Sequence, residues 1–208
     1  SSKSEIVTQM IYGENFKIIN KFSKWLKIKI KEDGYIGFIK NKKFISYFKP
    51  THKVSVLVAN IYKNSNYKKK TGRLTYTSKI KVEKIVSKFA KFQGVWIEIK
   101  NIKPINYENK NFFKDIEIFK SIKYKWGGKS FKGIDCSALI QVCLNFNNKF
   151  CPRDSAQQVN FFKKNINLKN IKKNDIIYWK GHVATAISGK KLIHAYGPQK
   201  RTLVMDIK

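Results

Sequence analysis

The 208-residue sequence contains few acidic residues, few prolines and no long hydrophobic run. Its longest apolar stretch, residues 54–62, is broken by polar residues and falls short of the roughly 18 that a membrane-spanning helix needs. We therefore expect no transmembrane segment. The chain opens without a basic region followed by an apolar one, so no signal peptide is visible.

Arginine is also scarce, although 44 basic and 13 acidic residues give a net charge of +31. Only Arg73, Arg153 and Arg201 are arginines, and the other basic residues are lysines. Recognition of phosphates and base edges favours the forked guanidinium group of arginine. No helix-turn-helix, zinc-finger or Gly-rich RNA-binding signature accompanies the charge. We expect no dedicated nucleic-acid partner and interpret the lysines as a solvated surface.

Cysteine occurs only three times, at Cys136, Cys143 and Cys151, with no CxxC spacing. This odd number and spacing argue against a disulfide framework and against a structural zinc site. We interpret Cys143 and Cys151 as small buried hydrophobic residues.

The sequence up to about Pro104 consists of short runs in which apolar and polar residues alternate, which is typical of strands. The pattern of residues 25–29 recurs at 96–100, which indicates two copies of one small β unit with boundaries near Pro50 and Pro104. The expected strands include residues 27–30, 74–77 and 96–100, with turns at 33–34, 71–72 and 93–94.

After Pro104 the period changes from two to that of a helix. The spacing predicts helices over residues 112–119 and 139–146, and a capping box predicts a third helix that opens at Asp154. Strands are then expected at residues 176–179, 182–187 and 192–196. Helices followed by strands make this part an α+β domain.

Cys136 directly precedes the helix expected over 139–146, so its sulfur is expected at a helix N-terminus. Free backbone N–H groups there lower the pKa of a thiol and bind an oxyanion. His182 and His194 lie 12 positions apart on a predicted hairpin, and if the connection has an odd number of loop residues, their even sum places them on one sheet face. A zinc site made of these three residues would lack a fourth ligand, so no metal site is predicted. His52 is interpreted as an ordinary strand residue.

Six sequence blocks resemble the NlpC/P60 cysteine peptidases in order and spacing, over about residues 105–208. Three motifs before them resemble bacterial SH3 domains, at residues 12–14, 25–28 and 33–37. The six blocks are residues 124–128, 133–137, 153–155, 175–179, 181–183 and 193–195.

This resemblance implies a papain-like α+β catalytic domain at 105–208, preceded by two small all-β SH3-like barrels at 1–50 and 51–104. Cys136 would be the nucleophile, His182 the base and His194 the residue that orients the base. The reaction implied is hydrolysis of the γ-D-glutamyl–diamino acid bond of peptidoglycan stem peptides (L-Ala-γ-D-Glu-diamino acid), without a cofactor. The enzyme would be a bacterial monomer, cytoplasmic or periplasmic, that acts in the turnover or recycling of murein peptides.

The resemblance also implies a set of substrate-binding residues. Residues from the first SH3-like barrel would bind the free amine of an N-terminal L-Ala, and residues around the nucleophile would hold the γ-D-Glu. Each of these residues could instead have only a structural role, because a tyrosine can pack beside its neighbours and an aspartate can cap a helix. The residues implied are Glu14, Tyr35, Tyr124, Asp135, Ser137, Asp154 and Ser155.

Two other function classes stay open from the sequence. One is a cell-wall protein that binds peptides without cleaving them. The other is a related Cys/His amidase or acyltransferase that acts on a different amide.

Overall fold

The computed structural model describes residues 4–162 and 165–207, which form two compact units. The β unit is Met10–Asn106, and the mixed unit is Ser1–Gln9 together with Tyr107–Lys208. No helix among the described residues is long and apolar enough to cross a membrane.

The β unit begins with a three-stranded antiparallel sheet in the order β1-β2-β3. Alternation along the central strand turns Leu26, Ile28 and Ile30 inward to form a small core. The turn after this strand contains Gly34 at φ +75°, a backbone conformation that favours glycine. The strands are β1 (Phe16–Lys21), β2 (Trp25–Ile30) and β3 (Ile36–Lys40).

Two further sheets complete the β unit around a second core that includes Val54, Ile80 and Ile97. The five-stranded sheet has the order β6-β5-β10-β9-β8, and the three-stranded sheet has the order β11-β4-β7. The strands are β4 (His52–Val54), β5 (Val58–Tyr62), β6 (Lys70–Thr75), β7 (Lys79–Ile80), β8 (Lys84–Val86), β9 (Phe89–Phe92), β10 (Val95–Glu98) and β11 (Ile102–Pro104), with a 3₁₀ turn at Ile99–Asn101.

Two of the turns predicted in this unit have different outcomes. Gln93 and Gly94 both have positive φ, 45° and 76°, and form the tight turn between β9 and β10, as predicted. The turn predicted at 71–72 is wrong, because Gly72 lies inside β6 and pairs with Ile61. A Cβ on Gly72 would lie 3.1 Å from the Ile61 side chain, so the glycine serves close packing across the strands.

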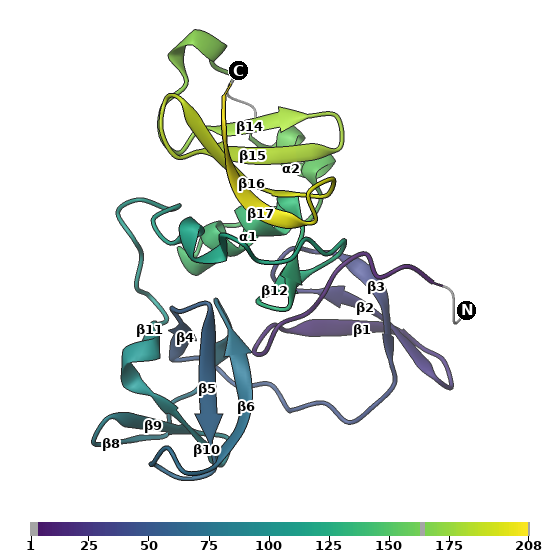
Figure 1. The fold of residues 1–208 in the computed structure, drawn as a ribbon. Helices are drawn as coiled ribbons and strands as arrows, with labels where there is room; N and C mark the ends of the chain where they lie inside the picture. The colour runs from purple at the N-terminus through teal and green to yellow at the C-terminus, as the bar shows by residue number, and fades with distance from the viewer. Residues whose placement is uncertain (1–3, 163–164, 208) are drawn as a thin grey trace. The chain divides into compact units, whose positions relative to one another are not determined.

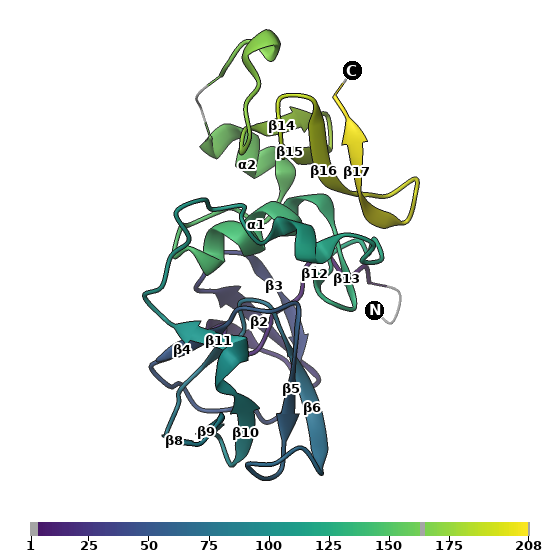
Figure 2. The same cartoon turned by 60° about the vertical axis from the view of Figure 1, so that its left-hand side comes forward.

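The mixed unit packs a helix against an antiparallel sheet of order β14-β15-β16-β17 (Figures 1 and 2). The helix α1 (Cys136–Phe146) is buried along almost its whole length and contacts β15 and β16. The other elements are α2 (Ser155–Phe161), β12 (Lys129–Ser130), β13 (Gly133–Ile134), β14 (Ile176–Trp179), β15 (His182–Ala186), β16 (Lys191–Tyr196), β17 (Arg201–Asp206) and 3₁₀ turns at Ile116–Phe119 and Leu168–Asn170.

The sequence prediction for this unit is confirmed for α1 and for β14 to β16, while β17 was not predicted. The helix expected over 112–119 is wrong, since only Ile116–Phe119 is helical and it is a 3₁₀ turn. Its buried side chains, Phe113, Ile116 and Phe119, recur every third residue, which fits the three-residue period of a 3₁₀ helix. The helix at Asp154 begins as predicted, but the Asp154 side chain makes no capping hydrogen bond.

Residues near the N-terminus are part of the mixed unit. Thr8 Oγ1 accepts a hydrogen bond from Arg153 Nε at 2.9 Å, and Gln9 Oε1 accepts one from the Lys129 N–H at 3.0 Å. Gly127, at φ +68°, lies so close to the Ile6 backbone that a Cβ there would clash with it. The N-terminal segment is therefore anchored beside the loop that leads to Cys136.

Candidate active site

Cys136 is the first residue of α1 and is only 5% exposed. The preceding Asp135 caps the helix, since its Oδ1 accepts a hydrogen bond from the Ala138 N–H at 2.8 Å. The backbone N–H groups of Cys136, Ser137 and Val183 all interact with the Cys136 sulfur. Since Val183 follows His182 on β15, the sulfur lies beside the strand that carries the first histidine.

The pKa of the Cys136 thiol differs from the sequence prediction. Burial, followed by the negative charge of Asp135, raises this pKa above its usual value. The three backbone N–H groups act in the opposite direction but do not outweigh the burial. The thiol is therefore protonated at neutral pH in the resting state, and the lowered pKa expected from the helix N-terminus is wrong.

The two histidines lie together on one sheet face, as their parity predicts. Thr185 pairs with Ile193 across β15 and β16, which makes His182 and His194 diagonal neighbours. His182 Nε2 lies 2.8 Å from His194 Nδ1, and the two rings meet edge to face with centroids 5.0 Å apart. The Tyr196 ring stacks on His194 at 4.7 Å, and the Trp179 ring lies 5.7 Å from His182.

Burial makes both imidazoles neutral at neutral pH. It lowers the pKa of His182 below the usual value of 6.5. For His194, burial and the neighbouring His182 lower the pKa to about 4. His182 is therefore the better base of the two, while His194 stays neutral and can only accept or donate hydrogen bonds.

A buried ion pair holds the loop that carries the cysteine. Arg153 is 1% exposed and binds Asp135 through two nitrogens, with Nη1 3.0 Å from Oδ1 and Nη2 2.6 Å from Oδ2. Arg153 Nη1 also donates to Ser137 Oγ at 3.0 Å, and Ser137 donates to Asp135 Oδ1 at 3.2 Å. The Gly127 N–H donates to Asp135 Oδ2 at 2.9 Å. The Asp135 and Ser137 side chains thus bind each other and Arg153 on both sides of the cysteine.

The structure brings Tyr124 into the same site. Burial raises the pKa of the Tyr124 hydroxyl to about 12, and Cys136, Asp135 and Arg153 lie close enough to influence it. This hydroxyl therefore keeps its proton and can donate a hydrogen bond beside the thiol. A Cβ on Gly197 would lie 3.5 Å from the Tyr124 ring, which places that glycine against it.

The remaining residues implied as substrate-binding lie in two places. Asp154 and Ser155 are half-buried at the start of α2, which is tied to α1 because Gln158 Nε2 donates to the Ser137 carbonyl at 2.9 Å. Glu14 and Tyr35 belong to the β unit. Glu14 Oε2 accepts a hydrogen bond from the Ile11 N–H at 2.9 Å.

Several residues of the site were missed from the sequence as members of it. Tyr196 follows His194 by two positions on a strand, so the period of two could have placed it on the same face. Trp179 pairs with His182 across β14 and β15 and could have been found the same way. Met205 lies on the unpredicted β17, and no sequence signal pointed to it.

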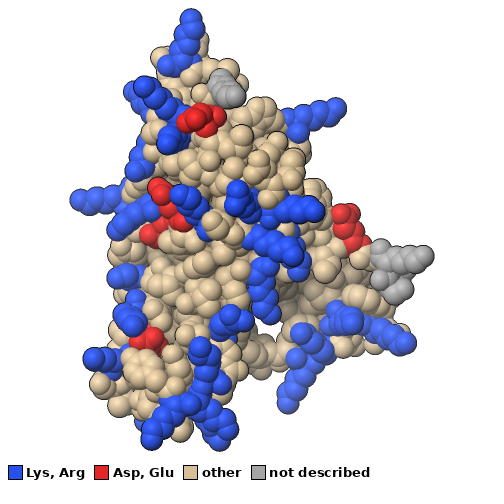
Figure 3. Space-filling view, viewed as in Figure 1, with Lys and Arg blue, Asp and Glu red and all other residues tan. Residues whose placement is uncertain are grey.

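Among residues 4–162 and 165–207, no group of three or more His, Cys, Asp or Glu side chains could hold a metal ion. Cys143 and Cys151 are fully buried, as predicted. Lysine and arginine side chains are spread over much of the face seen in Figure 3.

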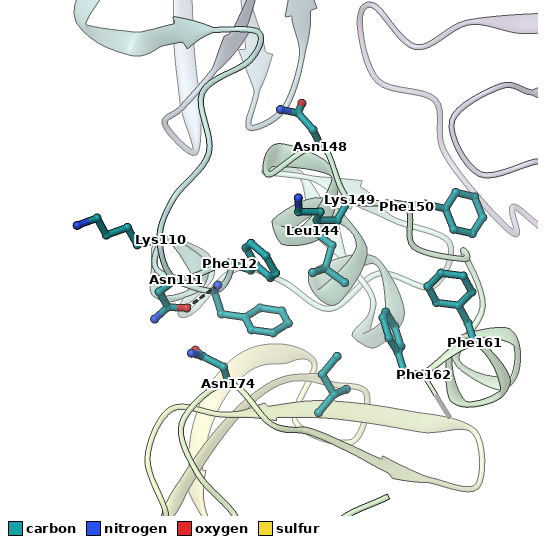
Figure 4. A pocket seen from close by; sticks show the side chains of 12 residues that line it. Lys110, Asn111, Phe112, Leu144, Asn148, Lys149, Phe150, Phe161, Phe162 and Asn174 are labelled. Carbon is teal, nitrogen blue, oxygen red and sulfur yellow. Dashed lines mark hydrogen bonds between the residues drawn. The ribbon is translucent and has the colours of Figure 1, made fainter. Parts of the chain in front are cut away.

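A separate cavity of about 670 Å³ lies near the C-terminal end of α1, in the mixed unit. Phe150, Phe161 and Phe162 gather at one end, while Asn111 and Asn174 lie at the other (Figure 4). Its described lining residues include no Cys, His, Ser, Asp or Glu. It therefore holds no cysteine or histidine, and the candidate active site is the cluster around Cys136.

Two parts of the chain match known protein families. Residues 121–206 match the NlpC/P60 family, and residues 1–44 match the bacterial dipeptidyl-peptidase SH3 domain. The chain therefore contains an NlpC/P60 domain together with a bacterial SH3 domain, as the motifs predict. The second SH3-like barrel, over 51–104, stays a prediction, as do the boundaries of all three domains.

Particular relatives show how far the similarity extends. Gamma-D-glutamyl-L-lysine dipeptidyl-peptidase of Bacillus subtilis is 25% identical over 216 residues, which cover 91% of this chain and 72% of the relative. Dipeptidyl-peptidase 6 of Lysinibacillus sphaericus is 36% identical over 72 residues, 35% of this chain, and this match spans only 27% of the relative. A crystal structure of an NlpC/P60 family protein from Bacillus cereus, 19% identical, has a TM-score of 0.81 over 96% of this chain and 76% of its own, which shows the shared fold.

Proposed function

We propose that the protein is a cysteine peptidase that hydrolyses the γ-D-glutamyl–diamino acid bond of peptides derived from peptidoglycan. The observation that carries the proposal is that the Cys136 sulfur, at the N-terminus of α1, interacts with the backbone of Val183, the residue after His182, whose ring contacts His194. Nothing in the packing of a helix on a sheet requires these three side chains to lie together. The name of the Bacillus subtilis relative, gamma-D-glutamyl-L-lysine dipeptidyl-peptidase, supports the choice of bond.

The proposed mechanism begins from a neutral thiol and a neutral imidazole. His182 Nε2 faces His194, so the other ring nitrogen, Nδ1, takes the thiol proton as the Cys136 sulfur attacks the γ-carbonyl carbon. The N–H groups of Cys136 and Ser137 donate to the oxyanion that forms. His182 then protonates the departing amine, and water hydrolyses the thioester with His182 again as the base.

The proposed substrate carries a free N-terminal L-Ala, as the motif resemblance implies. Tyr124 and Ser155 would hold the γ-D-Glu portion, together with backbone groups of Ser137. Glu14 and Tyr35, with Asp154 as a second carboxylate, would bind the ammonium group of L-Ala, because a buried cation requires an anionic or polar partner. The Asp135 and Ser137 side chains are already hydrogen-bonded to Arg153, so we propose that they shape the site around the nucleophile.

The free-amine proposal is tested with L-Ala-γ-D-Glu-meso-diaminopimelate and its N-acetylated form. We expect the wild type to prefer the free amine, and Glu14→Gln to raise KM for the free peptide about tenfold with little change in kcat, because roughly 1.4 kcal/mol of charge-assisted binding is lost. The acetylated peptide controls for general damage and should respond little to the substitution. Equal KM values for the two enzymes on the free peptide would remove Glu14 from the proposed site.

A further inference from the structure

The histidine pair has a third partner that the proposed mechanism does not yet use. His194 Nε2 lies 3.1 Å from the sulfur of Met205, on the neighbouring strand β17. His194 Nδ1 lies 2.8 Å from His182 Nε2. Both ring nitrogens of His194 are therefore in contact with hydrogen-bonding atoms, one on each side.

The chemistry of these atoms leaves only one favourable arrangement of protons. A thioether sulfur carries no hydrogen and can only accept a hydrogen bond. The contact with Met205 is therefore favourable only when the proton of His194 is on Nε2. In a neutral imidazole Nδ1 is then an acceptor, so it takes the N–H of His182 Nε2. The Nδ1 of His182 is left with its lone pair exposed, which is what a base requires.

The opposite arrangement has two costs. A proton on His194 Nδ1 would place two lone pairs against each other at the Met205 contact. The same proton would bind His182 Nε2 and force the His182 proton onto Nδ1, where it would block removal of the thiol proton. Both rings are neutral at neutral pH, so each carries a single proton that can lie on either ring nitrogen. Either arrangement of the two protons is therefore available to the pair.

We propose that Met205 is a positioning residue that selects the tautomers of His194 and His182 and thereby exposes the Nδ1 of His182 as the base. The claim about tautomers stands on the contacts alone, while its effect on the rate rests on the proposed function. The Tyr196 ring, stacked on His194 at an interplanar angle of 9°, holds the His194 ring plane so that Nε2 continues to face the sulfur.

The test is ¹⁵N nuclear magnetic resonance of histidine-labelled protein, combined with kinetics on L-Ala-γ-D-Glu-meso-diaminopimelate. We expect the wild type to show His194 protonated at Nε2 only. Met205→Leu keeps the side-chain volume but removes the acceptor. It should give a mixture of tautomers and lower kcat about fivefold with KM unchanged, as loss of one hydrogen bond implies. Met205→Glu supplies a new acceptor and should restore the Nε2 proton.

Met10→Leu is the matched control, because Met10 is the other of the two methionines. Met10 lies in the β unit, where it packs against the small core that includes Leu26. It should change neither the tautomer nor kcat. A His194 proton on Nδ1 in the wild type, or an unchanged tautomer in Met205→Leu, would overturn the proposal. If the tautomer shifts as expected but the wild type cleaves no peptide, the role of Met205 in selecting the tautomer is supported and the proposed function fails.

Discussion

Arg153→Met is expected to lower the free energy of unfolding by about 3–5 kcal/mol, the usual cost of removing one partner from a buried ion pair. The substitution leaves the Asp135 carboxylate buried without its counter-charge, and it also removes the hydrogen bonds from Arg153 to Ser137 and Thr8. The segments that contain Thr8, residues 135–137 and residue 153 would no longer be held together by one side chain. Urea unfolding of the wild type and the variant measures the difference.

Lys149→Met is the matched control for this prediction. Lys149 pairs with Glu108 at 3.1 Å, but their side chains are 44% and 38% exposed, so its loss should cost less than about 1 kcal/mol. Adding Asp135→Asn to Arg153→Met removes the unpaired charge and should recover part of the stability. An Arg153→Met variant no less stable than Lys149→Met would show that the buried pair does not hold this loop.

His182→Ala is expected to lower kcat/KM by about 10³- to 10⁴-fold, because the thiol of Cys136 is protonated at rest and cannot attack without a base. The wild-type rate should fall only at pH values below the usual histidine pKa of 6.5, since burial lowers the pKa of His182 and only its neutral form accepts the proton. This loss of rate in acid should disappear in His182→Ala. The pH dependence of kcat/KM measures both effects.

His52→Ala is the control, since His52 lies on β4 in the other unit and its Nδ1 contacts Thr51 Oγ1 at 2.9 Å. It should retain the wild-type rate and pH profile. If His182→Ala kept more than about a tenth of the activity, or kept the loss of rate in acid, another group would have to be the base.

The positions of the proposed catalytic residues followed from local sequence patterns. Cys136 before an amphipathic run indicated the start of α1, and the parity of 182 and 194 placed both histidines on one face of β15 and β16. These predictions succeeded because helix and strand periods depend on neighbouring residues. The same reasoning failed for residues 112–119, where the spacing of the buried side chains suits a 3₁₀ turn as well as a helix.

The parts of the site that could not be predicted depend on contacts between distant residues. Arg153 meets Asp135 across 18 positions and Thr8 across 145, and no local pattern signals either contact. The direction of the Cys136 pKa shift also depends on tertiary structure. A helix N-terminus alone lowers the pKa of a thiol, but burial of this sulfur raises it by more.

The central claim, that Cys136 attacks the γ-D-glutamyl bond, is tested most directly with purified wild type and Cys136→Ala. Both are incubated with L-Ala-γ-D-Glu-meso-diaminopimelate and with the corresponding L-lysine peptide, and the products are identified by mass spectrometry. Release of L-Ala-γ-D-Glu and the free diamino acid by the wild type, and not by Cys136→Ala, is the predicted result. Intact peptides with both proteins, or equal cleavage by both, would contradict it.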